Sequence, residues 1–485
     1  MFFCGKSSVY AMEYVDGEDT YEYSILANGT VKITDYQGKS RTIKIPAQID
    51  GRKVTIIGQS AFSYATRCLD AIEIPPTVTT IESWAFTQGS LKEITIPSSV
   101  KSIGYYAFHC CARLETVNFS DGLNELGYGA FAECKALSNI EIPSSITRLE
   151  NWTFKGCTSL TSITIPRNIT TMGIGVFENC TSLKKIVIED HSVGLIDENV
   201  FDNTAWYNSQ PDGVVYFENA LYGYKGTMPE NTSITVKNGT AYIVDHAFQE
   251  QNNLTGITLQ NSLTEIEMYA FDGCTGLKEI TIPDSVTNIG QAAFKNCTKL
   301  EKVKLPSKLK TISYYLFYEC TSLAEIEIPE TVTTIYGEAF FQCTSMDSIY
   351  ISKNVQNIGF GAFSNMDGAK VVISEENPYF TAENDCIYNK EKTVLIACLS
   401  RLEKVIIPDT VVELSSGAFS SNSFIKEIVI PKSVTKIGNS VFAYCTSLES
   451  LSIPDSVTQF GGSMFMGCTS IKKLRCHQTL LQWEN

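Results

Sequence analysis

The sequence predicts a β-rich α/β solenoid of about 17 coils, in which short strands and single helical turns stack one coil on the next. The first observation is a repeat of 23 residues: residues 277–299 are LKEITIPDSVTNIGQAAFKNCTK, and residues 323–345 are LAEIEIPETVTTIYGEAFFQCTS. The second is that each repeat holds two short apolar patterns followed by Ala-Phe-x-x-Cys. Repeats of about 20–50 residues are typical of solenoids, whose coils bury their apolar faces only against their neighbours. We therefore expect an extended, ordered surface that works by binding.

The first apolar pattern of the repeat predicts a half-buried strand. Ile280 and Ile282 face inward, and Glu279 and Thr281 alternate with them, which gives the period of two that a strand requires. Pro283 ends the strand because proline has no N–H group for a continuing ladder. The outward positions of this strand column are small, polar and mixed in charge, so they form either a protein-binding sheet or an ordinary solvated face. They include Glu93, Thr95, Asn139, Glu141, Ser162, Thr164, Glu279, Thr281, Lys302, Lys304, Glu325 and Glu327.

The second apolar pattern leads into a tight turn. Val286 and Ile289 face inward, and Gly290 permits the chain to turn. The Ala-Phe-x-x-Cys segment that follows is expected to form one helical or 3₁₀ turn, with Phe294 and Cys297 on the same face. The Phe recurs at intervals of 22 to 24 residues within three groups and should stack on the Phe of the next coil. Its positions are Phe86, Phe108, Phe131, Phe154, Phe177 and Phe201, then Phe248, Phe271, Phe294, Phe317, Phe340 and Phe363, then Phe419, Phe442 and Phe465.

Ten of the 16 cysteines lie three residues after the repeat Phe. Their spacing differs from the C-x-x-C pairs of metal and redox sites. Free cysteine behaves as a small apolar residue, so we expect a column of buried thiols. Cys386 and Cys398 flank an apolar hairpin and are the best candidates for a disulfide. The ten repeat cysteines are Cys111, Cys134, Cys157, Cys180, Cys274, Cys297, Cys320, Cys343, Cys445 and Cys468.

The chain is expected to form one continuous solenoid domain with caps and two insertions. Each insertion holds two apolar strands around polar turn residues, as in GVVYFENALYGYKG and CIYNKEKTVLIAC. Such segments predict β-hairpins that project from the stack, where solenoid insertions often serve binding. The expected segments are 1–20, a disordered segment or leader remnant; 21–50, an N-terminal β cap; 43–201, coils; 202–233, the first hairpin; 234–373, coils; 374–400, the second hairpin; and 401–485, coils and a C-terminal cap.

Charge and motifs exclude several classes of function. The formal net charge is −15, with 53 acidic against 38 basic residues, which argues against a nucleic-acid partner. No apolar run is long enough to span a bilayer, so we expect no membrane insertion. The N-terminal MFFCGKSSVYA is too short for a secretory signal peptide. A glycine-rich phosphate loop and an H-E-x-x-H motif are both missing, and the four histidines lie in different coils. We therefore expect no enzyme activity, no cofactor and no metal.

The two positions between Ile-Gly and Ala-Phe of the repeat are expected to be exposed or half exposed. In successive coils they hold Trp84, Tyr105, Tyr106, Tyr128 and Trp152. Stacking of the coils would align these rings into a ladder, and aromatic side chains are enriched at binding surfaces. The alternative is lateral packing that seals the outer edge of each coil. These five residues are the candidate ligand-binding residues.

The columns L-x-x-I-x-I-P and I-G-x-x-A-F-x-x-C, over about residues 43–474, resemble those of the BspA-like leucine-rich-repeat proteins of bacterial surfaces. The resemblance implies a right-handed superhelix and no shared catalytic residues. It also implies a secreted or surface-attached protein that adheres to host extracellular or matrix proteins, or to other cell-surface proteins. We therefore expect non-catalytic adhesion through the extended repeat surface. Carbohydrate binding through the aromatic ladder and a structural spacer are the alternatives.

Overall fold

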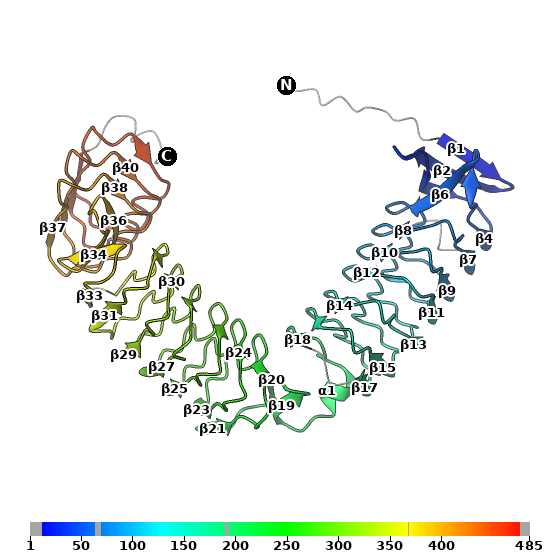
Figure 1. Cartoon of the computed structure of the whole chain (residues 1–485), viewed down its shortest axis with the longest axis horizontal. Helices are drawn as coiled ribbons and strands as arrows, with labels where there is room; N and C mark the ends of the chain where they lie inside the picture. The colour runs from blue at the N-terminus through cyan, green and yellow to red at the C-terminus, as the bar shows by residue number, and fades with distance from the viewer. Residues whose placement is uncertain (1–11, 64–68, 190–193, 367, 476–485) are drawn as a thin grey trace. The chain divides into compact units, whose positions relative to one another are not determined.

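The computed structural model in Figure 1 describes residues 12–63, 69–189, 194–366 and 368–475. Its contacts divide the chain into two compact units, Met1–Pro211 (unit 1) and Asp212–Asn485 (unit 2). The chain makes about 19 turns of about 23 residues each. The solenoid is thus confirmed, and the expected figure of about 17 coils is too low. The cap and both insertions also contribute strands to the stack, which accounts for the difference.

Helical structure is almost absent, so the expected α/β character is wrong. The segment around each repeat Phe forms consecutive turns, because left-handed residues precede and follow it. Around Phe108 these are Tyr106, with φ of 55°, and Cys110, with φ of 58°. A left-handed residue interrupts a right-handed helix. Among the described residues the only α-helix is α1 (Ala205–Asn208).

Unit 1 begins with an antiparallel meander that covers the first coil. Strand β1 (Met12–Asp16) pairs with β2 (Asp19–Ile25), which pairs with β3 (Val31–Gln37). Strand β3 then pairs in parallel with β6 (Arg52–Ile57), the first strand of the stack. The expectation of disorder or a leader remnant is therefore wrong for residues 12–20, whereas residues 1–11 lie outside the described residues.

Each coil of unit 1 contributes a longer and a shorter strand, and Figure 1 shows the two series on opposite sides of the stack. Most of these strands pair in parallel with their counterparts in the next coil, and the ladder is interrupted between some coils. The longer ones are β4 (Thr42–Lys44), β7 (Ala71–Glu73), β9 (Glu93–Ile96), β11 (Thr116–Phe119), β13 (Asn139–Ile140), β15 (Ser162–Ile165) and β17 (Lys185–Ile188). The shorter ones are β8 (Thr80–Ile81), β10 (Ser102–Ile103), β12 (Glu125–Leu126), β14 (Arg148–Leu149), β16 (Thr171–Met172) and β18 (Leu195–Ile196); β5 (Gln48–Ile49) pairs with β6.

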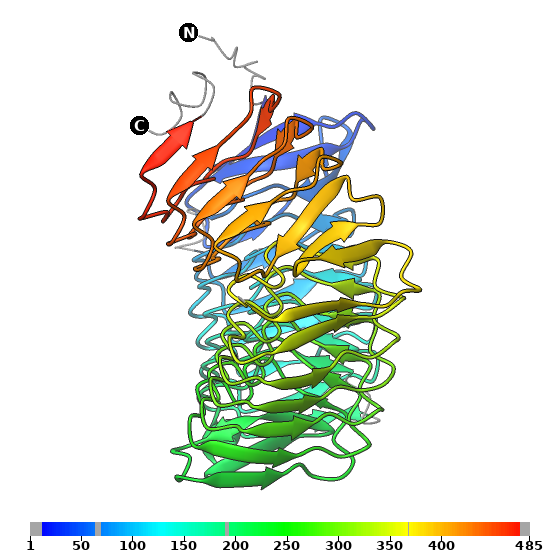
Figure 2. The same ribbon diagram turned by 90° about the vertical axis from the view of Figure 1, so that its left-hand side faces the viewer.

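Unit 2 repeats this plan, and Figure 2 shows its longer strands side by side. They are β21 (Thr232–Thr235), β23 (Leu254–Thr258), β25 (Glu279–Thr281), β27 (Lys302–Lys304), β29 (Glu325–Glu327), β31 (Ser348–Ile351), β33 (Lys370–Ile373), β37 (Lys404–Ile406), β39 (Glu427–Val429), β41 (Ser450–Ser452) and β43 (Lys473–Arg475). The shorter ones are β22 (Tyr242–Ile243), β24 (Glu265–Ile266), β26 (Asn288–Ile289), β28 (Thr311–Ile312), β30 (Thr334–Ile335), β32 (Asn357–Ile358), β38 (Glu413–Leu414), β40 (Lys436–Ile437) and β42 (Gln459–Phe460).

The two insertions do not project from the stack as expected. The first contains the antiparallel pair β19 (Gly213–Phe217) and β20 (Ala220–Lys225), and β20 pairs in parallel with β22. The second contains β34 (Phe380–Glu383), β35 (Cys386–Asn389) and β36 (Val394–Cys398), and β36 pairs in parallel with β38. The last strand of each insertion therefore takes the place of a shorter strand, which satisfies its backbone groups within the ladder.

The repeat Phe side chains form the core of both units, stacked ring on ring and almost fully buried apart from the half-buried Phe465. The rings of Phe86 and Phe108, for example, have centroids 5.1 Å apart at an interplanar angle of 9°. In unit 1 the column extends beyond the repeats, because Tyr36 of the cap stacks on Phe62 and Phe62 stacks on Phe86. A single residue type thus provides the same contact from coil to coil, as a one-dimensional stack requires.

The ten repeat cysteines form the buried column that their spacing predicts, except that Cys468 is half-buried. Each thiol donates a hydrogen bond to the carbonyl of a Phe one coil earlier, as from Cys297 Sγ to Phe271 O at 3.2 Å. Burial raises the pKa of the Cys274 thiol to about 12 and also raises the pKa of Cys297 and Cys343. These side chains therefore fill the core, join neighbouring coils through hydrogen bonds, and are poor nucleophiles.

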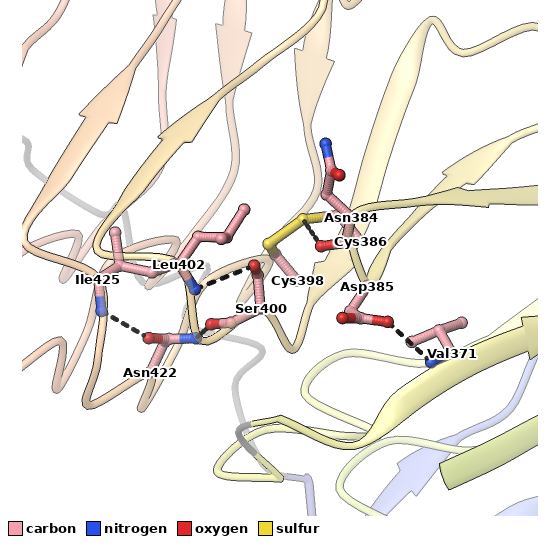
Figure 3. Close-up of a disulfide and its surroundings, with 9 residues drawn as sticks. All are labelled: Val371, Asn384, Asp385, Cys386, Cys398, Ser400, Leu402, Asn422 and Ile425. Carbon is pink, nitrogen blue, oxygen red and sulfur yellow. Dashed lines mark hydrogen bonds between the residues drawn. A yellow bond between two sulfur atoms is a disulfide. The ribbon is translucent and has the colours of Figure 1, made fainter.

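Cys386 and Cys398 form a disulfide, as their position suggested (Figure 3). They lie directly opposite each other on β35 and β36. Beside them the Asp385 carboxylate accepts a hydrogen bond from the Val371 N–H at 3.2 Å. The disulfide thus joins two strands of the second insertion, and the Asp385 hydrogen bond joins the insertion to strand β33.

Candidate functional site

The five candidate aromatic residues occupy two successive positions in the turn that follows each shorter strand. Tyr105 and Tyr128 hold the first position, and Trp84, Tyr106 and Trp152 hold the second. All three second-position residues have left-handed backbone, with φ of 62°, 55° and 59°. Their N–H groups donate to first-position carbonyls of the next coil, as from Trp84 N to Tyr105 O at 2.9 Å. The backbone of both positions is therefore fixed regardless of the side chains that they carry.

The second-position rings pack sideways on the following coil. Trp84 stacks on Tyr106, with ring centroids 4.5 Å apart and an interplanar angle of 22°. A Cβ on Gly129 would lie 2.4 Å from Cε1 of Tyr106, so that ring lies over the glycine. Trp152 lies over Gly175 in the same way, because a Cβ there would come 2.9 Å from its Cδ1. Tyr106 and Trp152 are consequently half-buried, and the continuous ladder of five rings does not form.

The first-position tyrosines lie in a different place. The rings of Tyr105 and Tyr128 meet edge to face, with centroids 5.5 Å apart. Their side chains are 56% and 37% exposed, and both line a groove of about 870 Å³ along the shorter strands β8, β10 and β12. This groove, which runs from Lys32 to Glu150, is called the tyrosine groove.

Charged side chains surround the tyrosines in this groove. Three of them are acidic and two are basic: Glu82, Glu125, Glu150, Lys32 and Arg148. Lys32 Nζ lies 2.5 Å from Glu82 Oε2, and Arg148 Nε lies 3.2 Å from Glu150 Oε1. Sequence reasoning missed these groups because Lys32 comes from the cap strand β3, and the other four lie in or directly after the shorter strands, whose outward positions were not considered. A count of charges along the shorter strands and the turns after them would have found those four.

Unit 2 carries aromatic residues at the same two positions. Tyr314 is 47% exposed, and its ring lies 4.6 Å from that of Tyr336. Tyr269 stacks on His246 at 4.9 Å, and Phe360 lies 2.7 Å from where a Cβ on Gly417 would be. Most of these rings thus pack on neighbouring coils of their own unit, and Tyr314 provides a matched control for Tyr105.

The described part of the chain contains no group of three His, Cys, Asp or Glu side chains placed to hold a metal ion. Nor does any helix in that part have the length and hydropathy needed to cross a membrane. What the described residues present is a polar and aromatic surface on a rigid stack, with two well-defined hollows in unit 1: the tyrosine groove and a smaller pocket beside Trp84.

Known proteins share the repeat. A family model described as the BspA type leucine rich repeat region, in six copies, matches residues 36–135, 85–207, 241–370 and 396–485. A leucine rich cell surface protein from Faecalibacterium prausnitzii A2-165 is 29% identical, over 75% of this chain and 95% of that chain, with a TM-score of 0.34. A leucine-rich repeat protein from Bacteroides ovatus ATCC 8483 is 24% identical, over 97% and 96%, with a TM-score of 0.32. One from Eubacterium ventriosum ATCC 27560 is 19% identical, over 95% and 96%, with a TM-score of 0.34. No curated protein matches the chain.

Proposed function

Because the chain belongs to the family of BspA type leucine rich repeat proteins, we propose that it is a non-catalytic bacterial protein, secreted or held at the cell surface, that binds another protein. Its partner is a host extracellular or matrix protein or another cell-surface protein. Adhesion of this kind uses the extended repeat surface, and the tyrosine groove is the part of that surface that makes the contact. One observation carries the proposal: two exposed tyrosines meet in an open groove that crosses several coils.

The groove has the dimensions of an extended segment of protein. Neighbouring strands lie about 4.8 Å apart, so four shorter strands span about 15–20 Å, which corresponds to about five residues of extended chain. Tyrosine combines a large apolar ring with a hydroxyl group and is enriched where a few side chains dominate binding energy. The surrounding acidic excess favours a partner segment that carries lysine or arginine.

A structural spacer, the simplest alternative, would need only the buried columns. Nothing in such a role accounts for Tyr105 with a side chain 56% exposed, since its ring contributes little to the stack. Single exposed aromatic residues are ordinary, but a pair in one groove is a feature of interaction sites.

The test removes both rings without disturbing the coils. Ser83 and Asn151 occupy the first position in the flanking coils, so Tyr105→Ser and Tyr128→Asn use side chains that the stack already accommodates there. Binding is measured by interferometry against purified extracellular matrix proteins and mucins. If each tyrosine contributes about 1–2 kcal/mol, the double variant should bind about 30-fold to 1,000-fold more weakly.

Tyr314→Ser is the matched control, because it removes an exposed first-position tyrosine from unit 2. It should bind like the unaltered protein. Equal binding by all three proteins would move the contact to another face of the stack. No binding by any of them across the panel would favour the spacer.

A further inference from the structure

A second hollow lies beside Trp84 and shares no residue with the tyrosine groove. Tyr106 covers the face of the indole that is turned toward the following coil. In the preceding coil the same position holds Ser60, with φ of 57°, so among the described residues no ring covers the other face. Trp84 is accordingly 37% exposed. The Trp84 indole is therefore an aromatic platform that packs on Tyr106 with one face and leaves the other face uncovered by the described residues.

The rest of the pocket is polar and uncharged. Its volume is about 280 Å³, and its lining consists of Ser60, Ser63, Trp84, Thr87, Gln88 and His109. The imidazole of His109 meets the rings of both Trp84 and Tyr106 edge to face, with centroids 5.8 and 5.3 Å away. Burial lowers the pKa of His109 against a smaller opposing effect of Glu133, so its ring is neutral at pH 7.

The polar groups have defined roles toward a ligand. The Thr87 hydroxyl donates its proton to the His109 carbonyl at 3.0 Å, so toward a ligand it acts as a hydrogen-bond acceptor. The serine hydroxyls of the lining can both donate and accept. A charged ligand would lose hydration here without meeting an opposite charge, which is costly. The lining therefore selects a neutral molecule that has one apolar face and many hydroxyl groups.

We propose that this pocket binds a single pyranose ring of a neutral carbohydrate, with the C–H face of the sugar stacked on Trp84. A pyranose is the ligand class that combines a flat apolar face with a rim of hydroxyl groups. The pocket volume lies just below the range of about 300–1,000 Å³ that is typical of ligand sites, which suits one ring and not an oligosaccharide. This site does not rest on the function proposed for the tyrosine groove.

The variants follow from the repeat itself. Trp84→Asn removes the platform, and Asn199 shows that asparagine holds the same position with φ of 58°. Ser60→Tyr places a ring over the open face of Trp84, as Trp84 itself covers Tyr106, and so fills the pocket without removing the platform. Trp152→Asn is the matched control, because that ring lies over Gly175 and does not line the pocket.

The experiment titrates the full chain with the methyl glycosides of glucose, galactose and mannose, with N-acetylglucosamine, and with sialic acid as a charged probe. Saturation-transfer NMR of the sugar protons reports binding in every variant, and thermal melting confirms that each variant is folded. We expect at least one neutral sugar to bind with Kd of about 1 mM, and Trp84→Asn and Ser60→Tyr to weaken this at least about tenfold. Trp152→Asn should bind within about twofold of the unaltered protein.

Three results would overturn the proposal: no saturable binding of any neutral sugar, equal binding by Trp84→Asn, or tighter binding of sialic acid than of every neutral probe. Binding that persists in the Tyr105→Ser and Tyr128→Asn double variant supports it, since the pocket and the groove share no residue. Loss of protein binding with intact sugar binding therefore separates failure of one site from failure of the other.

Discussion

Replacing Phe317 with alanine measures how strongly the Phe column holds neighbouring coils together. The ring is fully buried between Phe294 and Phe340, with centroids 5.8 and 5.5 Å away. Truncation of a buried Phe to Ala costs about 3–5 kcal/mol. Loss of two ring pairs, each worth about 0.5–1.5 kcal/mol beyond the buried area, places this position at the upper end, at about 4–5 kcal/mol.

The same substitution at Phe465 provides the comparison. This ring lies in the last described coil, is half-buried, and stacks on Phe442 at 5.8 Å. One ring pair and less apolar area are lost there, so we expect about 2 kcal/mol. The difference in free-energy loss between the two variants measures how much a second neighbouring coil contributes to the stability of the Phe column.

Hydrogen exchange followed by mass spectrometry suits this comparison, because a stacked array opens in segments and a single unfolding free energy is not well defined for it. Phe317→Ala should lower the opening free energy of its own coil, which holds β27 and β28, and of the coils on both sides of it, whereas Phe465→Ala should affect only the last coils. Equal losses in the two variants, or a loss spread evenly over unit 2, would refute the nearest-neighbour reasoning.

The other predictions concern the thiol column and the left-handed positions. In peptide-resolved alkylation of the native protein, Cys274 and the other buried repeat thiols should stay unlabelled; labelling without unfolding would contradict their burial. The unfolded chain loses thiol protons from about pH 8.5, while folded Cys274 keeps its proton up to about pH 12, so the stability of its coil should fall with rising pH by about 1.4 kcal/mol per unit for this thiol, as the urea dependence of Cys274 alkylation at pH 8 and 10 would measure. A flat profile would exclude this linkage. Gly129→Ala should destabilise unit 1 by more than the about 1–2 kcal/mol that left-handed backbone costs alanine, because its Cβ would meet the Tyr106 ring. Gly239→Ala, with φ of 89° and nothing within 4 Å, measures the backbone cost alone, and an equal effect would show that the ring moves freely.

The buried columns could be predicted because their spacing carries the signal. Fifteen Phe positions follow from the repeat, and Phe62 was overlooked although it ends the same I-G-x-x-A-F motif 24 residues before Phe86. The placement of the insertions could not be predicted in the same way. Strand β36 belongs to the ladder through its pairing with Glu413 and Leu414, and a hairpin pattern does not reveal which neighbour its last strand joins.

The arrangement of the five candidate residues could not be predicted from the sequence. The predicted ladder does not form because the rings of Tyr106 and Trp152 lie over Gly129 and Gly175 of the following coils. This packing depends on pairs of residues 23 positions apart, which the pattern at single repeat positions does not reveal. The left-handed backbone at Trp84 and Tyr106 could not be predicted either, because bulky side chains disfavour that conformation and its usual signal is glycine or asparagine. His109 received no role because its partners, Trp84 and Tyr106, come from its own coil and the preceding one.

The two turn positions explain how such a chain acquires binding sites without loss of stability. Their backbone is fixed by hydrogen bonds between coils, and the second position holds residues as different as Trp84, Gly129 and Asn199 in one conformation. The Phe and Cys columns lie on the inward side and do not change with them. Substitutions at these positions therefore alter the surface at a cost limited to their own coil and the coils that pack on it. The tyrosine groove and the pocket beside Trp84 both lie where these positions hold aromatic residues in adjacent coils, which is why we propose binding there.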